Sequence, residues 1–463
     1  MHPLIIPTVF LLLLTAAARI SQGSWAAPGA FFTLFWVVLV ILSYVVPEYP
    51  VWAGSLWWIV ATCFTFYVGS LTLIAYKARR RGVRVLQAGR SVKPVFLRLR
   101  TTLVACFLAG LLYTLAAATG VFVIAFGERP PLAYQALLSF HFAGPLLGGM
   151  ALGARMLQRG WRWVALLPLL PPAILAVMFT GRMALIGPCL YAIAGYFSGQ
   201  VLTRRVVTFS PRQVIAGAGL LVAFVAFAVA LDTFRTADVT KVTPYQRMGA
   251  YSEALERDTV YQRWPRLRPA VFGQVYSFSY FFAEAWHAPP PPRFGSVIFA
   301  GPLDLLGLGG ARYPFEEFEV EPGVLSNIFT MLRPPIEDFG LFGSLAWWLL
   351  IGILQGWAYS RTRSGSQIAC VVLSWFYVEI AVIGGFFFRY NVIILGNLLV
   401  FLYLWYSFAH ARRIRAVHPA MGSSVFASSS PWQEWRSSGG GARVKAQGRR
   451  AQWKAKAMFH PRA

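Results

Sequence analysis

The chain has 463 residues, of which 57% are hydrophobic and only 13% are charged, and its net charge is +25. This composition excludes an ordinary soluble enzyme and is typical of a polytopic membrane protein built as one helical bundle. The basic excess does not indicate a nucleic-acid partner, because cytoplasmic loops of membrane proteins collect Lys and Arg.

About eleven apolar stretches are long enough, or nearly so, to cross a membrane as helices. The first ends in an alanine run at 16–18 that resembles a signal-peptide cleavage site, but no Lys or Arg precedes it. We therefore predict an all-α polytopic membrane protein of about 11 transmembrane helices. The predicted spans are 3–18, 28–47, 52–76, 101–126, 133–153, 163–179, 183–202, 212–231, 338–358, 367–388 and 391–410.

The distribution of charge predicts the orientation of these helices. Residues 77–100 carry nine Lys and Arg and no acid, so this loop is expected to be cytoplasmic. Counting from it places the N-terminus outside and the C-terminus inside. Of the 17 acids, 13 fall within 232–338, which the same count places outside. The two asymmetries therefore agree with one topology.

Four regions follow from this reading. Residues 1–231 form a membrane bundle of helices 1–8, and 232–337 form one long extracytoplasmic loop between helices 8 and 9. Because structureless loops of this length are uncommon, we expect a folded subdomain, with a polar helix at 244–264 and an aromatic interfacial helix at 270–287. Helices 9–11 occupy 338–410. The basic tail 411–463 is expected to be disordered and cytoplasmic, either solvated or touching anionic lipid.

The stretch 327–343, NIFTMLRPPIEDFGLFG, places Arg333, Glu337 and Asp338 at the edge of the ninth span. The prolines at 334 and 335 suit the first turn of a helix or the turn before it. Asp338 then lies near the helix N-terminus, where a negative charge is favoured. The stretch is either a capped helix entering the bilayer or a site with chemistry of its own.

Arginines in the short outer hairpins run against the usual charge bias. Arg182 and Arg389 each lie in such a hairpin, and Arg333 stands just before a span. Three guanidinium groups at one membrane depth suit a phosphate, whereas a single one is explained by snorkelling. Glu379 lies inside the tenth span, and is either a functional carboxyl or a hydrogen-bonded structural one.

Several kinds of site have no sequence signal. The chain has no P-loop, no GxGxxG after a strand, no GxSxG and no HExxH. Its four cysteines lie in apolar runs without CxxC spacing, and His141 and His287 are isolated. We therefore expect no metal, no nucleotide, flavin or other cofactor, and no nucleic-acid partner.

The long loop resembles those of the oligosaccharide repeat-unit polymerases, the Wzy-type O-antigen and capsule polymerases. The resemblance covers about 175–360 and rests on YSFSYFFAEAW, RFGSVIFAGPLDLLGLGG and GVLSNIFTMLRPPIEDFGLFGS before an apolar span. TGRMAL around Arg182 is similar to a short outer hairpin of that family, with Thr180 where a serine is usual. The residues that fit the last run are Asn327, Thr330, Arg333, Pro334, Asp338, Phe339, Gly340 and Gly343.

The resemblance implies a glycosyltransferase of the bacterial inner membrane that polymerises undecaprenyl-pyrophosphate-linked repeat units at the outer face. The lipid pyrophosphate is the leaving group, and a chain-length regulator and a flippase are implied partners. Arg333 would stabilise the growing negative charge, and Asp338 or Glu337 would accept the proton of the attacking hydroxyl. Further candidates for binding the pyrophosphate and glycan are Arg182, Arg389, Arg312, Arg293, Asn327, Thr330, Tyr276 and Tyr280.

Two other functions stay open. A ligase that transfers the finished glycan to a lipid A core shares the architecture and the leaving group. A flippase for lipid-linked oligosaccharides would line its central cavity with several charges inside the spans, whereas this chain has one, Glu379.

Overall fold

The computed structural model describes residues 4–44, 51–81, 98–119, 132–179, 182–203, 274–305, 308, 318–321, 324–326, 331–381 and 391–417. The chain divides into two compact units, Met1–Trp405 and Tyr406–Ala463. The first unit holds the described helices up to the middle of the last one, together with every site residue discussed below.

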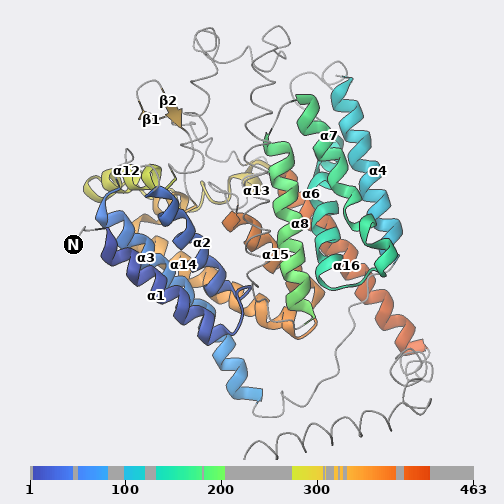
Figure 1. Cartoon of the computed structure of the whole chain (residues 1–463), viewed down its shortest axis with the longest axis horizontal. Helices are drawn as coiled ribbons and strands as arrows, with labels where there is room; N and C mark the ends of the chain where they lie inside the picture. Colours follow the sequence, from blue (N-terminus) through green and yellow to red (C-terminus); the bar gives the residue numbers. More distant parts are fainter. Residues whose placement is uncertain are drawn as a thin grey trace, which may run out of the picture. The chain divides into compact units, whose positions relative to one another are not determined.

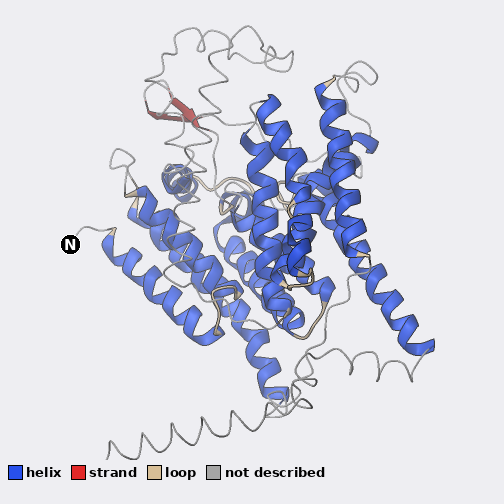
Figure 2. Cartoon of the chain, turned by 45° about the vertical axis from the view of Figure 1, so that its right-hand side comes forward, coloured by secondary structure: helices blue, strands red, loops and turns tan. Residues whose placement is uncertain are grey.

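The described part of the chain is almost entirely helical (Figure 2). Six of its segments are long and apolar enough to cross a membrane, and three shorter helices are also apolar. Each predicted span except 212–231, which lies outside the described residues, overlaps a described helical element, but the number of membrane crossings stays a prediction. In chain order these elements are α1 (Ile5–Gln22), α2 (Pro28–Ser43), α3 (Ala53–Arg81), α4 (Leu99–Ala118), α6 (Leu132–Gly153), η2 (Arg159–Ala165), η3 (Leu167–Leu169), α7 (Leu170–Phe179), α8 (Arg182–Leu202), α14 (Arg333–Arg363), α15 (Gln367–Ala381) and α16 (Asn391–Val417).

Helices α3 and α14 pack closely and run parallel. A Cβ atom placed on Gly352 would lie 2.3 Å from the carbonyl oxygen of Phe66, and one on Gly356 would lie 2.3 Å from that of Ser70. A step of four residues toward the C-terminus of α3 therefore corresponds to a step of four residues toward the C-terminus of α14. Because glycine has no side chain, the two backbones touch. Such close packing holds helices together inside a membrane, where water supplies no hydrophobic driving force.

Helices α6 and α8 repeat this arrangement on the other side of the bundle (Figure 1). A Cβ atom on Gly149 would lie 2.0 Å from the carbonyl oxygen of Ala192, and one on Gly153 would lie 2.1 Å from that of Tyr196. This pair is therefore parallel as well. The predicted topology gives the same direction to the third and ninth spans and to the fifth and seventh, so both pairs agree with it.

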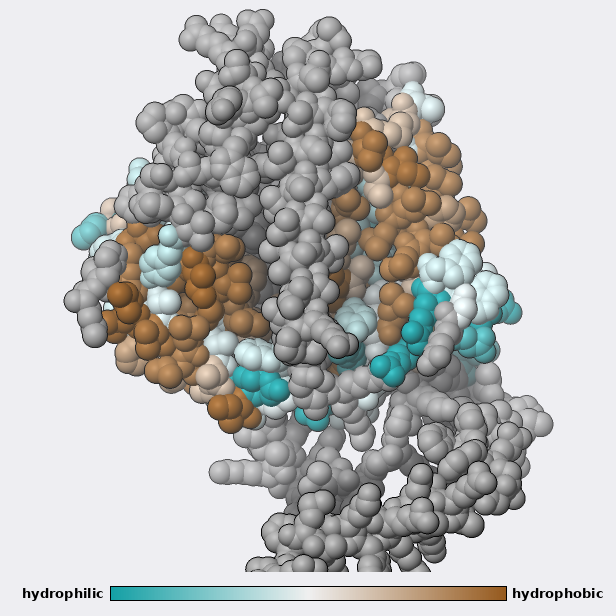
Figure 3. All heavy atoms as spheres, in the orientation of Figure 1, coloured by the Kyte–Doolittle hydropathy of each residue, from teal (hydrophilic) through white to brown (hydrophobic). Residues whose placement is uncertain are grey.

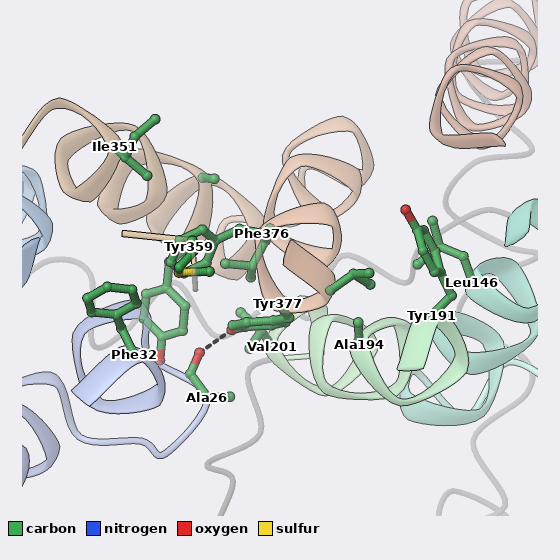
Figure 4. Packing of buried hydrophobic residues seen from close by; sticks show 14 of the residues in the cluster. Ala26, Phe32, Leu146, Tyr191, Ala194, Val201, Ile351, Tyr359, Phe376 and Tyr377 are labelled. Carbon is green, nitrogen blue, oxygen red and sulfur yellow. Dashed lines mark hydrogen bonds between the residues drawn. The ribbon is translucent and has the colours of Figure 1, made fainter. Parts of the chain in front are cut away.

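Large aromatic side chains fill the space between α2, α14 and α15 (Figure 4). Phe32 stacks on Phe66, with ring centroids 4.4 Å apart, and Phe66 stacks on Phe376 at 5.1 Å. The hydroxyl of Tyr377 donates a hydrogen bond to the carbonyl oxygen of Ala26, in the buried turn between α1 and α2. The core of the bundle is thus rich in aromatic and aliphatic side chains.

A short helix, α12 (Gln274–His287), lies across the ends of α2 and α3 (Figure 1). It confirms a helix over 274–287 of the predicted 270–287, and residues 270–273 lie outside the described residues. Beyond it are α13 (Ala300–Leu305) and a two-stranded antiparallel hairpin, β1 (Phe318–Glu321) and β2 (Val324–Ser326). This hairpin is an exception to the all-α prediction, which expected only a flexible stretch of Gly and acids there. The predicted helix at 244–264 lies outside the described residues.

Candidate functional site at the start of α14

Buried charge gathers at one place in the described part of the chain. The only Arg, Lys, Asp or Glu side chains that are buried there are Arg333, Glu337 and Asp338, which are 5%, 4% and 0% exposed. All three belong to the first turns of α14, which begins at Arg333 with two prolines in its first positions. The helix therefore starts five residues before the predicted span. Proline suits the first turn of a helix, where a backbone N–H would have no helical partner.

Arg333 and Glu337 form a buried ion pair one helical turn apart. The Arg333 Nε atom donates to the Glu337 Oε1 atom at 2.7 Å. The guanidinium group also lies 4.7 Å from the ring centroid of Phe281 in α12, close enough for a cation–π contact. A buried pair of this kind adds little net stability, since the cost of desolvating both charges offsets their attraction. Its presence therefore favours a role beyond holding the helix in place.

Asp338 uses both carboxylate oxygens to hold a distant segment. Its Oδ1 atom accepts a hydrogen bond from the backbone N–H of Val297 at 3.1 Å, and its Oδ2 atom accepts one from Ile298 at 2.8 Å. These charge-assisted bonds compensate for the burial of the carboxylate. They also occupy the oxygens that a general base would offer to a substrate hydroxyl, so the geometry favours a positioning role for Asp338.

Two more N–H groups of the same segment donate to backbone carbonyl oxygens of α14. The N–H of Arg293 donates to the carbonyl oxygen of Glu337 at 3.1 Å, and the N–H of Phe294 donates to that of Asp338 at 2.9 Å. Segment 293–298 thus donates four hydrogen bonds to residues 337–338, and we call this arrangement the outer clamp. It brings the backbone of Arg293 against Glu337, and the side chain of Arg293 is exposed.

Positive φ angles on both sides make the outer clamp possible. Gly340 has φ 73° and ψ −179°, which interrupts α14 and frees the carbonyl groups before it from their helical partners. In the opposing segment Phe294 has φ 50° and Gly295 has φ 90°. Glycine suits two of these positions, whereas Phe294 is a non-glycine residue held in a costly conformation, a feature that is common at functional sites.

Helix α12 contacts the charged turn through Phe281 and packs its buried side on α2 and α3. Its buried stripe, at helical spacing, consists of Val275, Phe278, Phe282 and Ala285. Its other side exposes Tyr280, which is 56% accessible. Burial, and then the neighbouring Tyr280, raise the pKa of Tyr276, so its hydroxyl stays protonated and can donate a hydrogen bond. Both tyrosines of the sequence prediction therefore lie on one short helix above the buried charges.

The remaining predicted site residues are placed only in part. Arg182 is the first residue of α8 and Glu379 lies in α15, but their side chains are outside the described set. The structure does not describe Arg312, Asn327, Thr330 or Arg389. Within the described ranges, no group of three or more His, Cys, Asp and Glu residues could hold a metal ion. His141 is buried, with its Nε2 atom 3.0 Å from the carbonyl oxygen of Gly110.

Sequence reasoning missed the partners of the predicted residues. Val297 and Ile298 contact the charged turn, although neither was singled out for a role, and Phe281, an expected sugar-stacking residue, contacts Arg333 instead. Val297 and Ile298 act through backbone N–H groups, so their role cannot be inferred from their residue types. The glycine that follows Phe294 was the available signal for a special backbone conformation.

Comparisons of the chain with protein-family models, curated proteins and solved structures give no match. The functional argument therefore rests on the residues of the site.

Proposed function

We propose that this protein is a polymerase of undecaprenyl-pyrophosphate-linked oligosaccharide repeat units. It would transfer a growing glycan from its lipid carrier to the terminal sugar of another lipid-linked unit, and release lipid pyrophosphate. The resemblance of the loop sequences and the buried charges at the start of α14 support this reaction. It needs no nucleotide, which is consistent with the motifs that the sequence lacks.

The proposal places this chemistry at the outer face of a bacterial inner membrane. Two parallel helices that both span a membrane need an odd number of crossings between them. The helices α4, α6, α7 and α8 supply an even number between α3 and α14. The predicted span at 212–231 would supply the missing crossing, and it would place the start of α14 on the side opposite the basic loop 77–100.

Each residue of the site has a physical task in this reaction. Arg333 would stabilise the charge that grows on the pyrophosphate as the sugar bond breaks, and the exposed Arg293 of the outer clamp would add a second guanidinium. Glu337 would hold Arg333 in place. Its carboxylate would also receive the proton of the attacking sugar hydroxyl. Asp338 would position segment 293–298, and Tyr276 and Tyr280 would contact sugar rings.

One observation carries the proposal: the buried charged side chains of the described chain fall within six consecutive positions, at one end of a span. Charges along the interior of the bundle would favour the interpretation of the protein as a flippase. In the described part of the bundle, the helix pairs α3–α14 and α6–α8 instead meet at glycines and apolar residues. A ligase remains the second candidate, because it uses the same leaving group.

Glycan profiling of a strain lacking this protein separates these functions. A polymerase predicts that single repeat units still reach the outer surface while long polymer is lost. Accumulation of full-length polymer on its lipid carrier would indicate a ligase. Retention of single lipid-linked units on the cytoplasmic side would indicate a flippase, and either of these two results would overturn the proposal.

A further inference from the structure

Around η2 the surface gathers arginines that have no acidic neighbours. Arg98 and Arg100 lie at the start of α4, and Arg155 and Arg162 lie between α6 and α7, all with exposed side chains. Between residues 49 and 231 the sequence contains one acid, Glu128. Among the described residues, no carboxylate forms an ion pair with any of these four arginines. The cluster therefore concentrates positive charge that an anion would neutralise.

Two contacts join the two halves of this cluster. The guanidinium of Arg100 lies 4.4 Å from the ring centroid of Trp161, and its Nη2 atom donates to the Gln158 Oε1 atom at 3.3 Å. Trp161 stacks on Trp163 with ring centroids 6.3 Å apart, and both indoles are exposed. Arg100 thus lies over an aromatic ring while its side chain remains exposed.

The backbone of this region is unusual at two of its arginines. Arg98 has φ 47° and Arg155 has φ 53°, which makes them two of the three non-glycine residues with positive φ in the described chain. Arg155 follows the last turn of α6, where glycine is the usual residue in the left-handed conformation. Arginine in a conformation that favours glycine points to a use for the side chain itself, because strain of this kind persists mainly at functional sites.

The surface next to the cluster is suited to hydrocarbon. Leu108 and Leu112 of α4 and Leu166 and Leu170 beside η2 are between 48% and 56% exposed. Figure 3 shows brown hydrophobic surface on the right of the molecule, giving way below to white and teal. Exposed leucines above, indoles at the boundary and arginines below reproduce the order of layers in a lipid monolayer.

We propose that Arg98, Arg100, Arg155 and Arg162, with Trp161 and Trp163, form a binding site for the phosphate headgroup of an anionic phospholipid. The arginines would contact the phosphate, the indoles would lie at the level of the glycerol, and the leucines would contact the acyl chains. Basic pockets between membrane helices on the cytoplasmic side bind such headgroups. The site is separate from the outer clamp, so it stands whether or not the protein is a polymerase.

Native mass spectrometry of the full chain in detergent tests this site, with phosphatidylglycerol and phosphatidylcholine of identical acyl chains. We expect tighter binding of phosphatidylglycerol. An electrostatic contribution of about fivefold per arginine predicts that the double variant Arg98→Gln, Arg100→Gln binds it about 25-fold more weakly. Trp161→Leu should weaken binding by a smaller factor, because the support of Arg100 is lost while the surface stays apolar.

Arg361→Gln is the matched control, because it removes one exposed arginine at the C-terminal end of α14. It should leave phosphatidylglycerol binding unchanged. Equal affinity for the two lipids, or an equal loss in the control, would overturn the proposal. Displacement of the lipid by millimolar inorganic phosphate would also overturn it, since the site would then select free phosphate.

Discussion

The helix pairs in the middle of the bundle and the outer clamp at the start of α14 are built by opposite means. Where α6 meets α8, glycines let two backbones touch, and neither charge nor positive φ is used. At the outer clamp, residues 333–340 and the segment 293–298 together contribute an ion pair, a carboxylate and three positive φ angles. The first region shows that this chain can associate helices without buried charge. The second therefore uses buried charge for a different purpose.

Of the substitutions that test this comparison, one that separates α6 from α8 should have the largest effect on the stability of the protein. A side chain at Gly149 would overlap the carbonyl group of Ala192, which cannot move without shifting α8. We expect Gly149→Val to destabilise the bundle by at least about 3 kcal/mol, the upper part of the usual range for overpacking. Thermal unfolding in detergent and the yield of inserted protein measure this effect.

Gly160→Val is the control for that experiment, because nothing lies within 4 Å of a Cβ atom at Gly160. It should unfold close to the wild-type temperature. A Gly149→Val protein of normal stability would show that close backbone contact between α6 and α8 is not what holds them together.

Changing Asp338 to asparagine should open the outer clamp while leaving the bundle intact. An amide can accept one of the two hydrogen bonds but turns its NH₂ group toward the other N–H, leaving a buried donor unpaired. The expected cost is about 1–3 kcal/mol, or roughly 5- to 150-fold faster amide exchange within 293–298. Hydrogen–deuterium exchange of the full chain in detergent measures this change segment by segment.

The exposed acid Glu284 on α12 supplies the comparison variant, Glu284→Gln, which should not alter exchange in that segment. Unchanged protection of 293–298 in Asp338→Asn would mean that the carboxylate does not hold the segment. The role of Asp338 as a proton acceptor would then be favoured again.

The sequence predicted the bundle better than the site, for physical reasons. Helices such as α3 and α8 can be predicted from long apolar stretches, because every backbone polar group of a span must be satisfied within its own helix. Arg333, Glu337 and Asp338 were also found, since charge at the edge of a span is conspicuous. Segment 293–298 was not linked to Asp338, because the contact joins backbone N–H groups to a carboxylate 40 and 41 positions further along the chain. The break at Gly340 was hidden as well, since DFG and FG sequences also occur in straight helices.

The central claim is that Arg333 acts on the reacting pyrophosphate, and Arg333→Lys tests it most directly. Lysine keeps the positive charge and can still pair with Glu337, but it lacks the planar fork of donors that matches phosphate. The measurement is polymer formation by purified protein from lipid-linked repeats extracted from the deletion strain, at matched protein levels and matched thermal stability. Arg361→Lys, an exposed substitution outside the site, is the control. Loss of a contact made mainly in the transition state predicts a rate lower by about 30- to 1,000-fold, equivalent to about 2–4 kcal/mol. A near-normal rate in Arg333→Lys would contradict the claim and reduce Arg333 to an anchor for the helix end.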